Sequence, residues 1–410
     1  MNVGIIGAGI VGLSSALWLQ RAGYRVTLID SNEPGQGASF GNAGLFADYA
    51  RLPFARFAMM RKMPGMLIDN QSPLSLQSHY LPDLLPYGWH FFKACFPANY
   101  SRGRQALTAL QALAPEADRI LLKRAEAEGL VRKEGCLGLF ETPEGYEEAK
   151  AGDLHERRDQ GVNLQFLSAD EVRELEPGLA GFHAGGVFYP DTRFTISPVE
   201  LSRRYAECFE ARGGCFLRER VGFVDPLPDG VRVQTSMQSI TFDHLVVAAG
   251  MASKWLSAQL GIKIPMVSER GYHLMLENND TQLNRPVGWL DKAVFLTPMI
   301  EGIRLAGTAE FAGTDAPPSR MRTNVMLQHA KKMLGGEPTV KASWVGSRPS
   351  TPDSLPVIGP LRKYPQITLA FGHGHLGLTL ASVTGQLVAQ TIQGTPTAVE
   401  MEAFSPERFQ

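Results

Sequence analysis

The chain has 410 residues, of which 44% are hydrophobic and 20% are charged. This length and composition predict more than one folded unit with extensive apolar cores, and they exclude a disordered protein. The 40 basic and 41 acidic residues give a formal net charge of -1. That balance argues against nucleic acid as a partner, because phosphate binding requires a basic face.

The first twenty residues are unusually apolar, since residues 2–20 contain no charged side chain. A signal peptide is not expected, because no Lys or Arg precedes the apolar stretch. A membrane span is not expected either, because glycines and two serines interrupt the run. A buried strand followed by a glycine-rich turn explains this composition better.

The turn has the pattern Gly-x-Gly-x-x-Gly, formed by Gly7, Gly9 and Gly12. A strand is predicted before it over residues 3–6, a helix after it over 11–21, and a second strand over 24–29. Gly7 permits the tight turn, Gly9 lets a pyrophosphate approach the backbone, and Gly12 allows close packing of helix on strand. The main-chain amides of Ile10 and Val11 then lie at a helix N-terminus, which attracts phosphate.

Asp30 follows the second strand and can accept hydrogen bonds from the two ribose hydroxyls of a dinucleotide. The same carboxylate disfavours the 2′-phosphate of NADP. The strand, turn, helix and acid therefore predict a Rossmann-type site for FAD or NAD.

Four later segments resemble the FAD-dependent D-amino-acid oxidase and dehydrogenase family, which also includes glycine and sarcosine oxidases. Gly37-Ala38-Ser39 and Asn42-Ala43-Gly44 are similar to the family's loop beside the pyrophosphate and flavin ring. A strand over 244–248 ending at Ala249 and Gly250 is similar to its third cofactor segment. Residues 346–359 are similar to its arginine motif, and 372–379 to its last flavin loop. The resemblance thus favours FAD over NAD.

The last flavin loop can also be interpreted from its own residues. A strand is predicted over 366–371, then three glycines, then a helix over 378–392. No acid follows at ribose spacing, so a second dinucleotide unit is not expected. The positive end of this helix would stabilise negative charge on the N1–C2=O edge of reduced flavin.

The resemblance implies non-covalent FAD, because no cysteine lies between residues 346 and 410, where some relatives attach the flavin. It implies a cofactor site made up of Gly7, Gly9, Ile10, Val11, Gly12, Asp30, Ser31, Ala38, Ser39, Asn42, Ala43, Gly44, Val221, Ala249, Gly250, Gly372, His373, Gly374, His375, Leu376, Gly377, Leu378 and Thr379.

The predicted fold class is α/β: a Rossmann-type FAD-binding domain with an interleaved mixed-sheet α+β substrate domain. We assign residues 1–50, 195–260 and 340–410 to the FAD-binding domain, and 51–194 and 261–339 to the substrate domain. Helix starts are expected at Thr142, Ser168 and Ser197. A hairpin is expected over 220–235, with Asp229-Gly230 as its turn.

The predicted reaction is oxidation of a D-amino acid, in which the Cα–H leaves as hydride to flavin N5. The predicted substrates include cyclic D-amino acids such as D-proline or hydroxy-D-proline. The resemblance gives Arg348 the substrate carboxylate, which a guanidinium can bind in bidentate fashion. Tyr272, on a predicted strand, is expected to line the pocket and bond the same carboxylate. His375 is expected beside the flavin as a base or a polarising group.

Three alternatives remain open at this point. One is oxidation of glycine, sarcosine or another primary or secondary amine on the same fold, since fold does not determine substrate. Another is a flavin-binding subunit that passes electrons to a partner. The least favoured is an NAD-dependent dehydrogenase. The electron acceptor is expected to be oxygen or a quinone of the respiratory chain.

Residues 51–104 differ from the rest of the chain, with nine aromatic side chains and seven basic residues against two acids. Such a stretch either packs on the substrate domain or makes a peripheral contact with an anionic membrane or an electron acceptor. The four cysteines, without a Cys-x-x-Cys pair or a histidine cluster at metal-ligand spacing, predict free thiols and no metal site. The expected location is cytoplasmic, with peripheral contact at the inner membrane as the alternative.

Overall fold

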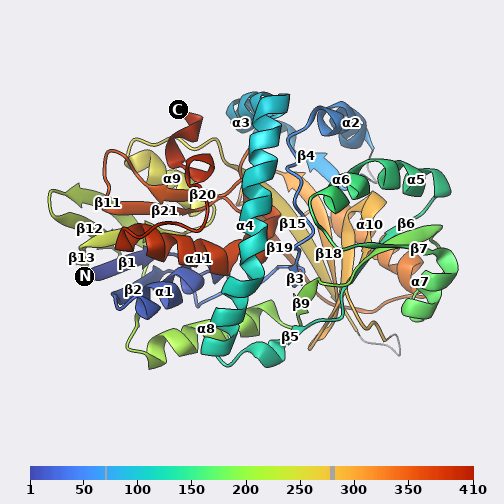
Figure 1. Ribbon diagram of the computed structural model, residues 1–410, viewed down its shortest axis with the longest axis horizontal. Coiled ribbons are helices and arrows are strands. Elements are labelled where there is room, and N and C mark those ends of the chain that lie inside the picture. Colours follow the sequence, from blue (N-terminus) through green and yellow to red (C-terminus); the bar gives the residue numbers. More distant parts are fainter. Residues whose placement is uncertain (70–71, 278–281) are drawn as a thin grey trace.

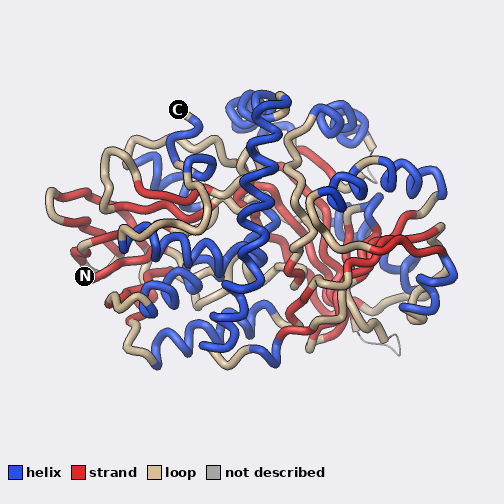
Figure 2. The backbone as a smooth tube through the Cα atoms, viewed as in Figure 1, coloured by secondary structure: helices blue, strands red, loops and turns tan. Residues whose placement is uncertain are grey.

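The computed structural model describes residues 1–69, 72–277 and 282–410. Two large sheets lie side by side, each covered by helices, and the chain passes between them several times (Figure 1 and Figure 2). Both chain ends lie on the side of the first sheet, at the left of Figure 1. The predicted α/β class with two interleaved units is therefore confirmed.

The first sheet has the strand order β10-β2-β1-β14-β21-β20. Its strands pair in parallel from β10 to β21, and only β20 runs antiparallel. Such a sheet brings the carboxyl ends of its parallel strands to one edge, where ligands bind. The strand bounds are β1 Asn2–Ile6, β2 Arg25–Asp30, β10 Cys215–Arg218, β14 His244–Val247, β20 Val357–Pro360 and β21 Ile367–Phe371.

Helices α1 and α11 pack against each other on this sheet. At Gly385 an added Cβ would lie 2.7 Å from the main-chain carbon of Ser14, so the two backbones approach as closely as only glycine permits. A small hairpin sheet extends the unit, formed by β11 Val221–Leu227, β12 Gly230–Thr235 and β13 Ser239–Phe242. The helices of the unit are α1 Ile10–Arg21, α8 Pro198–Ala211, α9 Ala252–Gln259 and α11 Gly377–Gln393.

The second sheet has nine strands in the described residues and is mixed, because β6 pairs β16 and β4 pairs β18 in parallel while the other pairs are antiparallel. Strands β15 and β19, at one edge of this sheet, lie on the side of the first sheet. The strand bounds are β4 Leu74–Leu76, β6 Cys136–Phe140, β7 Gln165–Ser168, β8 Gly185–Tyr189, β15 Val267–Leu276, β16 Val287–Trp289, β17 Val294–Met299, β18 Gly302–Phe311 and β19 Val340–Ser350.

Helices and a small sheet surround this second unit. The predicted caps at Thr142, Ser168 and Ser197 are confirmed, because each hydroxyl accepts a hydrogen bond from the amide three residues later. The remaining elements are α2 Phe57–Ile68, α3 Leu81–Ala94, α5 Pro143–Ala151, α6 Asp153–Asp159, α7 Ala169–Leu175, α10 Arg320–Leu334, β3 Leu45–Phe46, β5 Val131–Arg132 and β9 Arg193–Thr195.

Two elements cross the domain boundaries that we expected. Helix α4, Pro97–Arg124, falls in the range assigned to the substrate domain, yet its buried Leu110 and Leu121 share a core with α1 and α11. Strand β19 falls in the range assigned to the FAD-binding domain, yet it pairs with β15 of the mixed sheet. The long helix α4 crosses the front of the molecule in Figure 1. No helix among the described residues has both the length and the apolar character needed to cross a bilayer.

Candidate active site

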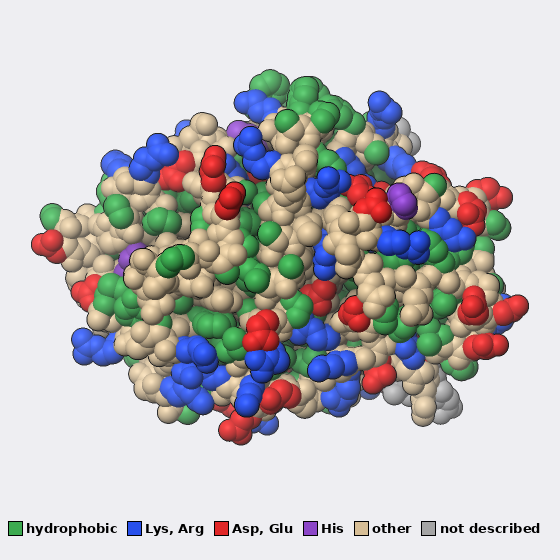
Figure 3. Space-filling view, in the orientation of Figure 1, with side chains coloured by type: hydrophobic (Ala, Val, Ile, Leu, Met, Phe, Trp, Pro, Cys, Tyr) green, Lys and Arg blue, Asp and Glu red, His purple; other side chains and the backbone are tan. Residues whose placement is uncertain are grey.

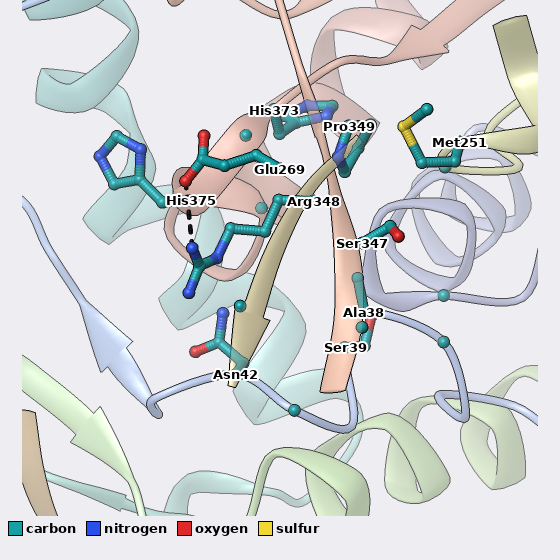
Figure 4. Close-up of a pocket in the computed structure, with 18 of the residues that line it drawn as sticks. Ala38, Ser39, Asn42, Met251, Glu269, Ser347, Arg348, Pro349, His373 and His375 are labelled. Carbon is teal, nitrogen blue, oxygen red and sulfur yellow. Dashed lines mark hydrogen bonds and ion pairs between the residues drawn. The ribbon is translucent and has the colours of Figure 1, made fainter. Parts of the chain in front are cut away.

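A cavity of about 1230 Å³ opens at the carboxyl ends of β1, β2 and β14 and continues to β15 and β19 of the mixed sheet. It is bordered by segments far apart in the sequence: the glycine turn, residues 35–43, the end of β14, the arginine strand and the last glycine loop. Figure 4 shows this meeting point. One continuous space therefore joins the dinucleotide edge of the first sheet to the second sheet.

The glycine turn has the backbone that a pyrophosphate site requires. Gly7 has φ +110°, and an added Cβ would lie 2.4 Å from the carbonyl oxygen of Ala248. At Gly12 an added Cβ would lie 1.9 Å from the carbonyl oxygen of Gly7. Gly9 meets only the Ser39 hydroxyl, at 3.3 Å, and lines the cavity. The turn can therefore receive a large anionic group at the N-terminus of α1.

Asp30 ends β2 and lines the cavity. Its Oδ2 accepts a hydrogen bond from the Ala8 amide at 2.8 Å, and its Oδ1 accepts one from the Asn32 amide at 2.9 Å. A carboxylate has lone pairs left after two such bonds, so it can also accept from ribose hydroxyls. The Ser39 hydroxyl accepts a hydrogen bond from the Ile10 amide at 3.0 Å, which brings the second glycine-rich loop to the first turn of α1.

The loop over residues 38–44 is held by groups that sequence reasoning missed. Arg304, buried on β18, donates hydrogen bonds to the carbonyl oxygens of Phe40 at 3.0 Å and Asn42 at 2.7 Å. Trp344 lies against Gly41, where an added Cβ would lie 1.7 Å from its ring. Burial lowers the pKa of Arg304 to about 10, so it stays charged at neutral pH. No sequence signal pointed to Arg304, since it belongs to none of the motifs recognised in the chain.

The structure separates the predicted cofactor residues into those that line the cavity and those that support it. Gly12, Gly44, Gly372, Leu376 and Thr379 do not line it. Among these, the Thr379 hydroxyl instead accepts a hydrogen bond from the Ala47 amide at 2.9 Å. The lining members are Gly7, Gly9, Ile10, Val11, Asp30, Ser31, Ala38, Ser39, Asn42, Ala43, Val221, Ala249, Gly250, His373, Gly374, His375, Gly377 and Leu378.

The two histidines of the last loop are in different environments. His373 is buried and its Nε2 lies 2.9 Å from the Thr384 hydroxyl, and burial lowers its pKa to about 3. His375 faces the cavity, with its ring 4.8 Å from that of Phe54. The surrounding protein lowers the pKa of His375 to about 4. Both imidazoles are therefore neutral at neutral pH.

Arg348 on β19 lies at the cavity wall beside His375 (Figure 4). Its Nη1 donates to Glu269 Oε1 at 3.0 Å and to the carbonyl oxygen of Thr308 at 3.0 Å. The guanidinium lies over Gly271, where an added Cβ would be 2.2 Å from Nη2. Asp353, five residues further along the chain, is paired with Arg408 at 2.7 Å and not with Arg348.

The prediction that Tyr272 lines the cavity is wrong. Its hydroxyl donates to Glu310 at 2.6 Å and accepts from the Ser319 amide at 3.0 Å, and the side chain does not line the cavity. Successive side chains of a strand point to opposite faces, so Tyr272 points away from the face that carries Glu269 and Gly271. Burial raises the pKa of Tyr272 to about 12. Tyr272 therefore supports helix α10 and does not contact a ligand in the cavity.

Beyond Arg348 the cavity extends into an apolar chamber beneath α2 and α3. Its lining side chains are large and hydrophobic, and they are Met59, Met63, Met66, Leu74, Tyr87, Phe91 and Phe311. Tyr87 and Phe311 lie with their rings 6.2 Å apart, which joins α3 to β18 across this space. Methionine side chains adapt to ligands of different shape, so the chamber fits an apolar group.

A parallel sheet with a glycine-rich pyrophosphate turn, joined to a mixed sheet that presents an arginine, defines an FAD-dependent oxidoreductase. The chain belongs to the FAD dependent oxidoreductase (DAO) family, whose model matches residues 2–391. Membership of this family makes the chain an oxidoreductase with FAD as its cofactor. The described residues fit this cofactor, since Gly7 and Gly12 leave no room for a Cβ and Gly9 faces the cavity.

The chain is similar to known proteins over its whole length. It is 36% identical to a D-amino-acid oxidase of Bradyrhizobium diazoefficiens, over 100% of this chain and 99% of that protein. It is 30% identical to a D-amino acid dehydrogenase of Paramagnetospirillum magneticum, over 100% of this chain and 99% of that protein. Its fold matches that of glycine oxidase from Geobacillus kaustophilus with a TM-score of 0.77 at 23% identity, covering 99% of this chain and 98% of that one.

Proposed function

We propose that the protein oxidises a D-amino acid, with Arg348 holding the substrate carboxylate. The observation that carries this proposal is the open edge of the Arg348 guanidinium. In the part of the chain that the structure describes, Nε and Nη2 make no hydrogen bond, while Nη1 is held by Glu269 and Thr308. Two parallel N–H groups on one edge match the two oxygens of a carboxylate.

The surroundings of Arg348 favour an amino acid with an apolar side chain, cyclic D-proline and hydroxy-D-proline included. A carboxylate on Arg348 places the rest of the substrate between the flavin loop around His375 and the apolar chamber. The two relatives named for D-amino acids cover this chain almost completely, which supports the same substrate class. Glycine and sarcosine remain the second candidate, since the fold of glycine oxidase is shared.

The chemistry requires little of the protein beyond orientation. Bound FAD supplies a two-electron acceptor for the hydrogen on the substrate Cα. Arg348 fixes the carboxylate, and the loop over residues 38–44, held by Arg304, fixes the opposite side of the cavity. His375 is neutral at neutral pH, so it can accept a hydrogen bond or proton without adding a positive charge to the site.

Anaerobic bleaching of the flavin absorption tests the proposal. The purified protein is mixed with D- and L-amino acids, glycine, sarcosine and simple amines. We expect rapid bleaching by apolar D-amino acids and slow or no bleaching by their L-enantiomers. Bleaching by glycine and sarcosine alone would favour the second candidate. No bleaching by any compound, with FAD present, would refute the amino-acid proposal and support an electron-transfer subunit.

We also propose that α3 rests on an anionic membrane surface, where a respiratory quinone would take the electrons. Its outer face exposes large apolar side chains, and Figure 3 shows hydrophobic side chains gathered at the top of the molecule over this helix. Lys93 lies over the ring of Trp89 at 5.0 Å, a pairing suited to a lipid interface. The exposed residues are Leu81, Leu85, Trp89 and Phe92 of α3, with Phe96 just before α4.

The basic surplus of residues 51–104 is smaller than their composition suggests. Arg56, Lys62 and Arg104 form ion pairs with acids of α5 and α6, at the side of this segment. Arg51, Arg61, Lys93 and Arg102 form no ion pair within the described ranges, but Arg51 is held by the carbonyl oxygens of Asp48 and Gln160. Arg61, Lys93 and Arg102 are therefore the charges left for an anionic surface. Hydrophobic contact by α3 is therefore the larger part of the proposed attraction.

Co-sedimentation with phosphatidylcholine vesicles containing phosphatidylglycerol tests the membrane contact. Leu85→Glu should reduce the bound fraction several-fold at unchanged activity with a soluble dye acceptor. Met237→Glu is the matched control, because Met237 is equally exposed but lies on the distant hairpin of β12 and β13. Equal binding of wild type and Leu85→Glu would refute the contact, and rapid reoxidation by air would favour oxygen as the acceptor.

A further inference from the structure

Arg348, the proposed substrate arginine, is paired with the carboxylate of Glu269. Glu269 on β15 is the registered neighbour of Arg348 on β19, so both side chains leave the same face of the sheet. Glu269 Oε1 accepts from Arg348 Nη1 at 3.0 Å, and Oε2 accepts from the Ser350 hydroxyl at 2.8 Å. Both residues line the cavity, and Figure 4 shows the pair beside His375.

Both members of the pair keep hydrogen-bonding capacity toward the cavity. Each oxygen of Glu269 accepts one hydrogen bond from a described residue, whereas an ionised carboxylate has about four acceptor sites. Arg348 keeps Nε and Nη2 for a ligand. The Glu269 side chain is 19% exposed and that of Arg348 is 25% exposed, so both remain reachable from the cavity.

Arg348 and Glu269 carry opposite charges, so together they add no net charge to the site. The other titratable groups that face it are His375, which is neutral at neutral pH, and Tyr87, whose pKa is raised by burial and by the nearby charge of Glu269. A ligand that carries only a carboxylate gains a hydrogen-bonded contact with Arg348 but meets the negative charge of Glu269. A ligand with a carboxylate and an ammonium on one carbon satisfies both charges.

We infer that Glu269 receives the amino group of the substrate, so that the Arg348–Glu269 pair recognises the two charges of an α-amino acid together. This inference deepens the proposed function and rests on it for the role of Arg348. It predicts a chemical selectivity: amino acids bind, whereas simple carboxylates and 2-hydroxy acids of the same shape bind weakly. The selectivity comes from a charge, because the chamber beyond it is apolar and cannot distinguish an amine from a hydroxyl or hydrogen.

The test uses two ligands that differ only in the amine and cannot be oxidised. 2-Aminoisobutyrate has no hydrogen on its α-carbon, and isobutyrate is its counterpart without the amino group. Both are titrated into the FAD-loaded protein at pH 7 by calorimetry, with wild type, Glu269→Gln and Glu269→Asp. The control is Glu277→Gln, the same change just beyond the far end of β15.

We expect wild type to bind 2-aminoisobutyrate more tightly than isobutyrate. Glu269→Gln should weaken the binding of 2-aminoisobutyrate by about tenfold to a hundredfold, which is the contribution of a charge-assisted hydrogen bond. Isobutyrate should bind to this variant as tightly as to wild type, or more tightly. Glu269→Asp should preserve the preference in part, and Glu277→Gln should leave it unchanged.

Equal weakening of both ligands by Glu269→Gln would show that Glu269 only positions Arg348, and would overturn the inference. An absence of preference in wild type would overturn it without any variant, including the case in which Glu269→Gln does not fold. The proposed function fails separately, in the bleaching assay with D-amino acids. A protein that shows the ligand preference but no bleaching would keep the charge-pair site and lose the proposed reaction.

Discussion

Gly271→Ala should displace Arg348, the proposed ligand of the substrate carboxylate, without removing it. An added Cβ at position 271 would lie 2.2 Å from Arg348 Nη2, whereas ordinary contacts begin at 3.4 Å, so the guanidinium must move by about 1.2 Å. Only the end of a flexible side chain is in the way, so the backbone of β15 can stay in place. Misplacing a binding group by about 1 Å can cost about a hundredfold in rate.

The assay is steady-state oxidation of the best D-amino acid, compared with FAD content and the thermal midpoint. We expect kcat/KM to fall about a hundredfold, equivalent to about 2.7 kcal/mol of transition-state stabilisation. The cofactor should be retained. The midpoint should change by no more than about 4 °C, since Gly→Ala in an unstrained strand changes stability by less than about 1 kcal/mol.

Gly336→Ala is the control, because no heavy atom of the described residues lies within 4 Å of its added Cβ. It should behave as wild type in all three measurements. A Gly271→Ala enzyme with kcat/KM within threefold of wild type would refute the placement of Arg348 as the carboxylate ligand. A parallel loss of FAD or of stability would instead show that position 271 matters for the fold.

Three other measurements check separate parts of the site. Gly12→Ala should lose most bound FAD and lower the thermal midpoint, because its Cβ would lie 1.9 Å from the main-chain oxygen of Gly7; a fully loaded variant would contradict the assigned turn. Arg304→Met should weaken FAD binding about tenfold or more by leaving two loop carbonyls unpaired, which equilibrium titration of the apoprotein measures. Burial lowers the pKa of His373 from 6.5 to about 3, so the unfolded state binds more protons below pH 6.5 and the free energy of unfolding should fall from pH 6.5 to 4. Denaturant unfolding at each pH should show that the free energy of unfolding depends less on pH in His373→Gln than in wild type. The same dependence on pH in both proteins would contradict the assignment to His373.

The dinucleotide turn was predictable because its residues act through the local backbone. Gly7 needs a positive φ and Gly12 lies against the carbonyl oxygen of Gly7, so both requirements arise within one strand, turn and helix, and Asp30 ends the next strand. Their spacing in the chain is therefore also their spacing in the site. The helix caps at Ser168 and Ser197 were predictable for the same reason, since each bond spans three residues.

The partners of the site were not predictable, because they depend on contacts between distant strands. Glu269 is 79 residues from Arg348, and Arg304 is 264 residues from the carbonyl of Phe40. The direction of Tyr272 depends on strand alternation, and a shift of one residue moves a side chain to the other face. Without the pairing of β15 and β19, neither face of the strand could be assigned to the cavity.

The way in which β19 ends has a mechanical consequence. Arg348 is two residues from Ser350, which forms an isolated bridge with His373 at the start of the last glycine loop. Two residues of main chain and this bridge therefore join Arg348, the proposed substrate ligand, to the last glycine loop. Movement of one sheet relative to the other would have to carry Arg348 and this loop together, so the two groups would keep their separation whatever side chain occupies the apolar chamber under α2 and α3.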